Sequence, residues 1–338
     1  MPSVRTEITE IVTGLATLGY QSINRALEVR PRHIAHVTDE VFDRLETARA
    51  AGAHDRDFRI AWDNGLVFAR SPQGLRGRPP WDLEWKGHHK PASRSIETIP
   101  ADLRIDSVFL ISCKYRSRIL HNSSPVALFD HALSPRGPAA RIDWFEEVSP
   151  EAFQRIWAPV HDRAGLRPNT PPSTTTSEQR QTVKDQLAEE PIDIDAVDYY
   201  DFVRDVSTNS AARWRANLGR AQQRNELLWR LLRMQAAPYF VLGAQHDNTP
   251  MQYRVDTPWD FSRHNHLLSF EVKPGQRRQP SVDWAAHIQQ AGGQTATVKG
   301  HVEVRWSHGK LNGPPEAKVY LDTDPHEIPG YKTLDPPR

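Results

Sequence analysis

Three side chains near the middle of the chain have types and a spacing that could act on a phosphate ester: Asp102, Ser112 and Lys114. Residues 108–111 read Val-Phe-Leu-Ile, a short apolar run that predicts a buried strand. Because side chains alternate along a strand, Ser112 and Lys114 are expected on one face. A lysine at the end of a buried strand is costly unless it meets an anion. An Mg²⁺-holding carboxylate beside such a lysine would suit phosphodiester hydrolysis.

The stretch around these residues resembles the PD-(D/E)XK superfamily of restriction-endonuclease-like nucleases. Pro100-Ala101-Asp102 matches the first half of the family's pattern and Ser112-Cys113-Lys114 the second, so the resemblance covers residues 80–130. It implies a mixed sheet flanked by helices, and a deoxyribonuclease that depends on Mg²⁺ or Mn²⁺. The family acts on DNA in restriction, repair and defence against mobile DNA. The catalytic residues that the resemblance implies are Lys114, Asp102 and Ser112.

The chain departs from the family at Ser112, where the family has Asp or Glu. A serine hydroxyl is a poor Mg²⁺ ligand beside a carboxylate, so a second acid must come from elsewhere in the chain. The candidate metal ligands, in order of preference, are Asp102, Asp106 and Glu84.

Which carboxylate reaches Lys114 depends on the turn of the predicted hairpin. A two-residue turn near Asp106 would set Asp102 opposite Ile111, facing away from the lysine. A three-residue turn would set Asp102 opposite Leu110, on the face of the lysine. A one-residue slip moves every side chain to the other face, so both registers stay open. In the alternative without a site, Lys114 ends its strand at the surface and pairs with an acid such as Asp106.

The composition of the chain limits which classes of protein it can belong to. The chain has 338 residues, enough for two domains, and a net charge of +1 that neither favours nor excludes nucleic acid. The single cysteine, Cys113, excludes an internal disulfide and a cysteine-based zinc site, and favours the cytoplasm. No apolar run approaches the length that spans a bilayer, so no membrane partner is expected. The candidate nucleic-acid contacts are Arg116, Arg118, Asn122, Arg305 and Lys310.

Periodicity predicts an α+β protein. Apolar residues at helical spacing from Ile8 predict a first helix. Glu7 and Glu10 on this helix could add a carboxylate to the site, since related nucleases often carry one on their first helix, but a solvated face is the preferred interpretation. Residues 58–69 predict a β-hairpin that turns at Asn64-Gly65. The last strands form either a second domain or an extension of the nuclease sheet. The predicted organisation is a helical lead-in with a nuclease-like core over 1–164, a flexible linker over 165–192, a helical connector over 193–237 and a β-rich module over 238–338.

Arginines stud the predicted connector. They fit either a face that tracks phosphates or, more commonly for such a run, a solvated surface of salt bridges. These residues are Arg213, Arg215, Arg220, Arg224, Arg230 and Arg233.

Taken together, these patterns predict a metal-dependent DNA nuclease. The alternative is a non-catalytic protein that keeps a degenerate nuclease core and binds nucleic acid or a protein partner. Ser112 favours that alternative, whereas a further acid on the face of Lys114 would favour the enzyme.

Overall fold

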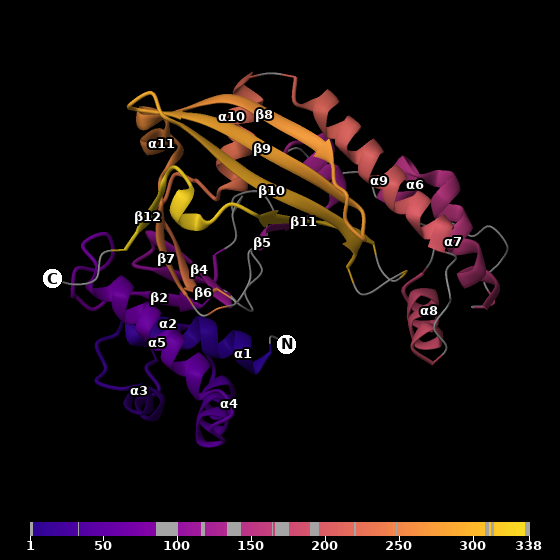
Figure 1. The fold of residues 1–338 in the computed structure, drawn as a ribbon. Coiled ribbons are helices and arrows are strands. Elements are labelled where there is room, and N and C mark those ends of the chain that lie inside the picture. Colours follow the sequence, from indigo (N-terminus) through magenta and orange to yellow (C-terminus); the bar gives the residue numbers. More distant parts are fainter. Residues whose placement is uncertain are drawn as a thin grey trace.

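Two β-sheets with helices packed on them make up the protein (Figure 1). Strands and helices are both abundant, which confirms the predicted α+β class. The structure, a computed structural model, describes residues 3–32, 34–85, 101–115, 119–133, 143–163, 165, 176–189, 196–219, 221–245, 247, 249–307, 311 and 314–334.

The first sheet carries the predicted core strand at its centre. Over the described residues it has seven strands, in the order β1-β2-β3-β4-β6-β7-β12. It is mixed, because β4 runs antiparallel to β3 and parallel to β6. The strands are β1 (Ile34–Ala35), β2 (Leu83–Trp85), β3 (Leu103–Ile105), β4 (Phe109–Tyr115), β6 (Tyr239–Ala244), β7 (Pro250–Val255) and β12 (Tyr331–Thr333).

The second sheet is antiparallel, and its described strands follow the order β5-β11-β10-β9-β8. The strands predicted for a module over 238–338 are therefore divided, since β6, β7 and β12 extend the first sheet. An early strand, β5, pairs with the late strand β11. The strands are β5 (Ile119–Ser123), β8 (Asn265–Pro274), β9 (Ser281–Gln290), β10 (Thr295–Trp306) and β11 (Pro315–Leu321).

The N-terminal helices pack beneath the first sheet (indigo and purple in Figure 1). The first helix is continuous through three segments, and its middle turn has π-helical hydrogen bonding. These helices are α1 (Val4–Glu7), η1 (Ile8–Val12), α2 (Thr13–Ala16), α3 (Ile23–Val29), α4 (Asp39–Ala50) and α5 (Asp55–Arg70).

Helix α5 replaces the β-hairpin predicted over residues 58–69, and that prediction is wrong. Phe58, Ala61 and Trp62 are buried at helical spacing, which outweighs the local turn preference of Asn64-Gly65. Gly65 instead lets α5 approach the first helix, because a Cβ there would lie 2.2 Å from the carbonyl oxygen of Thr13.

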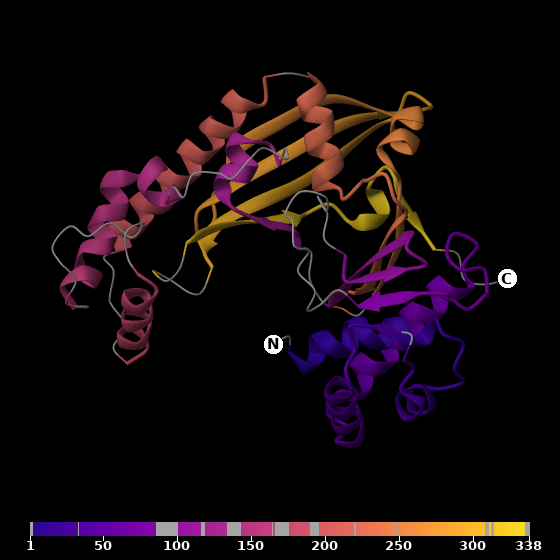
Figure 2. The ribbon, with the colours of Figure 1, turned by 180° about the vertical axis from the view of Figure 1, so that it is seen from behind.

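The remaining helices pack mainly around the second sheet. Seen from behind, α9 and α10 run across one face of that sheet (Figure 2), and α9 contacts β8 and β9. The linker predicted over 165–192 is described only in part, and the described part includes helix α8. These helices are η2 (Val126–Asp130), α6 (Trp144–Val148), α7 (Pro150–Arg163), α8 (Ser177–Glu189), α9 (Ala196–Asn217), α10 (Ala221–Leu231), α11 (Pro258–His264) and η4 (Pro325–Glu327).

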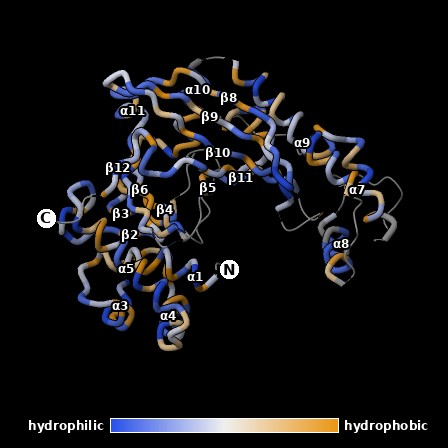
Figure 3. Tube along the Cα trace, viewed as in Figure 1, coloured by the Kyte–Doolittle hydropathy of each residue, from blue (hydrophilic) through white to orange (hydrophobic). Residues whose placement is uncertain are grey.

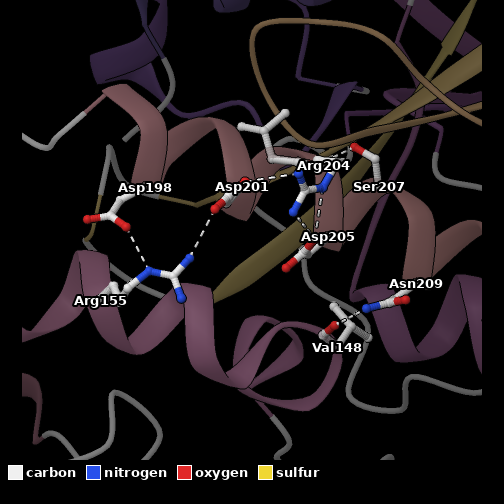
Figure 4. Close-up of polar contacts among 9 residues, drawn as sticks. Val148, Arg155, Asp198, Asp201, Arg204, Asp205, Ser207 and Asn209 are labelled. Atoms are coloured by element: carbon white, nitrogen blue, oxygen red, sulfur yellow. Dashed lines mark hydrogen bonds and ion pairs between the residues drawn. The ribbon is translucent and has the colours of Figure 1, made fainter.

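Salt bridges hold the helices of this layer together. Arg155 on α7 donates to Asp198, at 2.7 Å, and to Asp201 on α9 (Figure 4). Arg213, one of the predicted connector arginines, pairs with Asp130 at 2.7 Å and also contacts Glu147. Arg213 thus belongs to a salt-bridged surface. Of the other arginines in that group, Arg220 lies outside the described residues, and Arg233 is buried.

Two hydrophobic clusters meet at β4. Ile111 belongs to the cluster between the first sheet and the N-terminal helices, with Cys113 packed at its edge. Leu110 packs against the larger cluster, which lies between the two sheets and their helices. Hydrophobic segments accordingly gather around β4 in Figure 3. Among the described residues, no helix is both long and apolar enough to cross a membrane.

The contact between β4 and β6 leaves no room for a side chain at Gly243. A Cβ at this position would lie 1.9 Å from the carbonyl oxygen of Lys114. We expect Gly243→Ala to lower the free energy of unfolding by about 3 kcal/mol or more, because both strands are buried and cannot separate locally. Urea unfolding monitored by circular dichroism measures the change. The control is Gly292→Ala, where the new Cβ meets open space, with an expected change within about 0.5 kcal/mol. Equal unfolding midpoints for the two variants would contradict the close pairing of β4 with β6.

Candidate active site

The hairpin of β3 and β4 places Asp102 beside the strand that carries Lys114. Ile105 pairs with Phe109, so the turn has three residues, but the register is neither of the two that were predicted. Asp102 lies opposite neither Ile111 nor Leu110. The ladder of paired residues ends at Leu103, and the backbone N–H of Asp102 donates to the Ile111 carbonyl at 2.8 Å.

Cys113 has no paired residue on β3, because the ladder ends at Leu103, and the side chain of Asp102 takes that place. Its carboxylate accepts the backbone N–H of Cys113 at 2.7 Å. A hydrogen bond from a backbone amide to a carboxylate is charge-assisted and fixes the position of the acid. The carboxylate of Asp102 is therefore held at the backbone of Cys113, the residue before Lys114.

Glu10 brings a second carboxylate to this region from the first helix. It is 8% exposed, and its Oε2 accepts the indole N–H of Trp85 at 2.6 Å. Burial, and then the charge of Asp102, raise the pKa of Glu10 to about 8, while the Trp85 bond and the charge of Lys114 act in the opposite direction. The solvated face predicted for Glu7 and Glu10 is wrong, because Glu7 is also buried and pairs with Arg44 at 2.7 Å.

Lys114 is the cation of the site. Burial, and then the positive charge of Arg233, lower its pKa to about 8, while Asp102 and Glu10 act to raise it. It lines a cavity of about 30 Å³ together with Arg233 and Tyr331, which has room for a water molecule. A lysine with its pKa near neutrality can both hold and release a proton during a reaction.

Ser112 has a structural partner and does not face a candidate metal ligand. Its side chain is buried, and its Oγ accepts a hydrogen bond from Nη1 of Arg233 at 2.9 Å. The same guanidinium donates to the hydroxyl of Tyr239 and, at 2.8 Å from Nε, to the carbonyl oxygen of Leu120. Ser112 thus anchors a buried arginine between the two sheets.

Asp106 and Glu84, the other predicted metal ligands, lie away from Lys114. Asp106 is in the turn of the hairpin, where it binds Arg78 at 2.5 Å and accepts the backbone N–H of Trp81. The start of β4 lies five residues before Lys114, a separation of roughly 16 Å along a strand. Glu84 on β2 is level with Leu110 and pairs with Arg104 at 2.7 Å. The structure therefore groups neither acid with Asp102.

Two of the predicted nucleic-acid contacts, Asn122 and Arg305, are described, and both lie outside this group. Arg116, Arg118 and Lys310 fall outside the described residues. Asn122 and Arg305 lie on the second sheet and share one acid, since Asn122 donates to Glu316 at 3.1 Å and Arg305 lies 3.4 Å from it. This pair forms a charge-balanced patch and is separate from the candidate site.

Two carboxylates of the candidate site, Glu10 and Asp102, could hold a metal ion. Over the described residues, no group of three or more His, Cys, Asp and Glu side chains is arranged to hold a metal. Mg²⁺ commonly binds through one or two carboxylates and completes its shell with water and substrate phosphates. Glu10 and Asp102 fit that donor set, and their mutual repulsion, visible in the raised pKa of Glu10, is what a divalent cation would relieve.

The sequence offered Glu10 as a possible further carboxylate but favoured a solvated face for it, and it did not mark Arg233 as a neighbour of the site. A signal for Glu10 was its position among apolar neighbours, since Ile8, Ile11 and Val12 leave little room for a wide polar face. The π-helical turn then rotates Glu10 into the protein, which no spacing rule anticipates. Arg233 directly follows the apolar stripe of α10, and nothing in the sequence marks it as buried.

Comparison with known proteins adds no further constraint. No protein-family model, no curated protein and no solved structure matches this chain.

The buried carboxylate of Glu10 makes stability depend on pH. Its pKa is about 8 in the folded chain and 4.5 for the ordinary group, so the folded state holds more protons between these values and stability falls as pH rises. Glu10→Gln keeps an acceptor for Trp85 without the charge. At pH 8 we expect this variant to be more stable than the parent by roughly 2 to 4 kcal/mol, since one pKa unit is worth about 1.4 kcal/mol. At the acid end of the range the difference should vanish.

Urea unfolding across this pH range measures the effect. The control is Glu28→Gln, because Glu28 is exposed and pairs only at the surface with Arg25. Its effect should stay within about 0.5 kcal/mol at every pH. If Glu10→Gln follows the same pH curve as the parent chain, the carboxylate is not buried beside Asp102.

Proposed function

We propose that this chain is a metal-dependent nuclease that hydrolyses phosphodiester bonds of DNA, with its active site at Glu10, Asp102 and Lys114. One observation carries the proposal. These side chains come from three separate elements and lie close enough for the charges of Asp102 and Lys114 to shift the pKa of Glu10. Perturbed groups that cluster in this way are typical of catalytic sites.

The surrounding fold supports the proposal. The resemblance to the PD-(D/E)XK nucleases implied an acid before a hairpin, a lysine on the next strand and a mixed sheet flanked by helices. Asp102 precedes β3, Lys114 lies near the end of β4, and helices pack beneath this mixed sheet. Glu10 supplies a second carboxylate from the first helix, on the Cys113 side of β4, whereas Ser112 lies on the side of Arg233.

The residues suit the hydrolysis of a phosphodiester. Mg²⁺ or Mn²⁺, when bound, would lower the pKa of a water molecule and neutralise charge on the scissile phosphate. Glu10 and Asp102 would hold the ion, Asp102 being fixed by the N–H of Cys113. As water attacks the phosphorus, the bond to the leaving oxygen breaks and that oxygen takes up a proton.

Lys114 would stabilise the charge that develops on the phosphate or orient the attacking water. With its pKa near 8, its Nζ can also exchange a proton with either oxygen. Arg233 acts on the site through Lys114, whose pKa it helps to lower.

The cellular setting belongs to the same proposal. The family that the chain resembles acts in restriction, repair and defence against foreign DNA, and the single cysteine favours the cytoplasm. We propose DNA as the partner in that compartment.

A second function is favoured by one observation. Ser112 stands where the family has an acid, and its hydroxyl is engaged by Arg233. A chain that has lost this ligand could bind nucleic acid or a protein partner without cutting. The two functions differ in whether bound DNA is hydrolysed when Mg²⁺ or Mn²⁺ is supplied.

We expect the purified protein to cleave plasmid or single-stranded DNA in the presence of Mg²⁺ or Mn²⁺. Glu10→Gln, Asp102→Asn and Lys114→Met should each lower the rate by about 100-fold or more, because each removes a charge that acts on the transition state. A gel assay of nicked and linear plasmid, with chelator as the blank, measures the rates.

The matched control is Glu84→Gln, an acid that the sequence favoured and that the structure pairs with Arg104. It should stay within about threefold of the parent, a change worth less than 1 kcal/mol. Tight DNA binding without cutting would replace the nuclease with the non-catalytic function. If the protein neither binds nor cuts DNA, the proposal that it acts on nucleic acid is wrong.

A further inference from the structure

A second cavity lies at the opposite end of β4 from Lys114, where the parallel strands β4 and β6 both begin. It has a volume of about 600 Å³, within the range of small-molecule sites. The backbone N–H of Leu110 donates to the Pro238 carbonyl at 2.9 Å, which fixes the two strand starts against each other. The cavity is lined by Pro72, Gln73, Gly74, Leu75, Arg76, Arg78, Phe109, Pro238 and Arg254.

The lining of this cavity is cationic. Three of its side chains are arginines and none is an acid. Guanidinium groups present planar forks of N–H donors that match the oxygens of a phosphate. Such a lining favours an anionic ligand.

The arginines are only partly neutralised by neighbouring groups. Over the described residues, the guanidinium of Arg254 makes no hydrogen bond, and its contact with Asp260 is a distant 3.8 Å. The described hydrogen bond of the Arg76 guanidinium runs from Nε to the carbonyl oxygen of Pro72 at 3.0 Å. Arg78 alone has a close acid, Asp106. Two guanidinium groups therefore keep most of their donors for a ligand.

The remaining walls suit a flat, partly apolar group attached to that anion. Phe109, Leu75 and Pro238 supply apolar contacts within the cavity. At its rim, Arg78 lies 5.3 Å from the centre of the Trp81 ring, and Trp81 is 81% exposed. An exposed indole beside cationic groups is a stacking platform for a nucleobase.

We propose that this cavity binds a nucleotide, with the phosphate on Arg76 and Arg254 and the base against Phe109 and Trp81. The nucleotide is either a free nucleoside phosphate or the phosphorylated end of a DNA strand. The cavity is separated from Lys114 by five residues of β4, roughly 16 Å. The proposal does not rest on cleavage at Lys114, and it would stand for a non-catalytic protein as well.

The test is titration of the full-length chain in the presence of a metal chelator, which removes any contribution from divalent cations at Glu10 and Asp102. One arm uses adenosine monophosphate, with adenosine and inorganic phosphate beside it. The other uses a short single-stranded oligonucleotide with and without a 5′-phosphate. Calorimetry gives the affinity, and the fluorescence of tryptophan gives a second readout, because a base stacked on Trp81 quenches it.

We expect a phosphorylated ligand to bind and its unphosphorylated counterpart to bind at least 10-fold more weakly. Arg76→Gln and Arg254→Gln should each weaken binding about 10-fold and together about 100-fold, since each removes charge-assisted hydrogen bonds. The control is Arg25→Gln, an exposed arginine that pairs with Glu28, and it should leave the affinity unchanged. Saturation by the mononucleotide identifies a free ligand, and binding of the 5′-phosphorylated strand alone identifies a strand end.

Three results would overturn the proposal. They are no binding in either arm, equal affinity for adenosine monophosphate and inorganic phosphate, and binding that survives both arginine substitutions. Trp81→Ala adds a further requirement, because it should weaken nucleotide binding while leaving inorganic phosphate unaffected. Circular dichroism confirms that each variant is folded, and the outcome is independent of any nuclease assay.

Discussion

A single buried guanidinium joins the two sheets, and the geometry of the candidate site depends on it. Arg233 lies two residues after the end of α10, in a left-handed backbone conformation with φ of 61°, and is only 3% exposed. It donates to Ser112 on β4 and Tyr239 on β6 in the first sheet, and to the carbonyl oxygen of Leu120 on β5 in the second. Its described acceptors are neutral oxygens. A buried cation is tolerated only when it is fully hydrogen-bonded, so this network fixes the spacing of β4, β5 and β6.

Arg233 places a positive charge on one side of β4. Alternation along the strand sets Ser112 and Lys114 toward Arg233, whereas Cys113 packs toward the N-terminal helices. The positive charge of Arg233 disfavours a second cation, which together with burial lowers the pKa of Lys114. On the helical side, burial and then the charge of Asp102 raise the pKa of Glu10. The Lys114 ammonium and the Glu10 carboxylate are thus both held closer to neutrality than they would be in water, which is a condition for proton exchange near neutral pH.

Features of the fold that depend on a local sequence pattern could be predicted. Features that depend on contacts between distant segments could not. The core strand followed from a short apolar run and its polar neighbours, whereas the roles of Asp102 and Lys114 stay predictions. The hairpin predicted at Asn64-Gly65 failed because Gly65 serves contact with Thr13, about fifty residues away. The solvated face preferred for Glu10 was wrong, because the π-helical turn that carries Glu10 is buried. The pairings of β4 with β6 and of β5 with β11 join segments far apart in the chain, and no local propensity encodes them.

Ser112, which stands where the nucleases that the chain resembles have an acid, and the burial of Arg233 are best understood together. An acid at position 112 would lie within hydrogen-bonding reach of Arg233, as the serine hydroxyl does at 2.9 Å, and would form a buried ion pair instead of coordinating a metal. The serine gives Arg233 a neutral acceptor, so the proposed nuclease site would rest on the carboxylates of Glu10 and Asp102. Because phosphate oxygens can complete the shell of Mg²⁺, two protein carboxylates would suffice in that proposal when substrate is present. The proposed site would then bind a metal ion more weakly in the free protein than in a complex with DNA, so that the substrate itself would complete it.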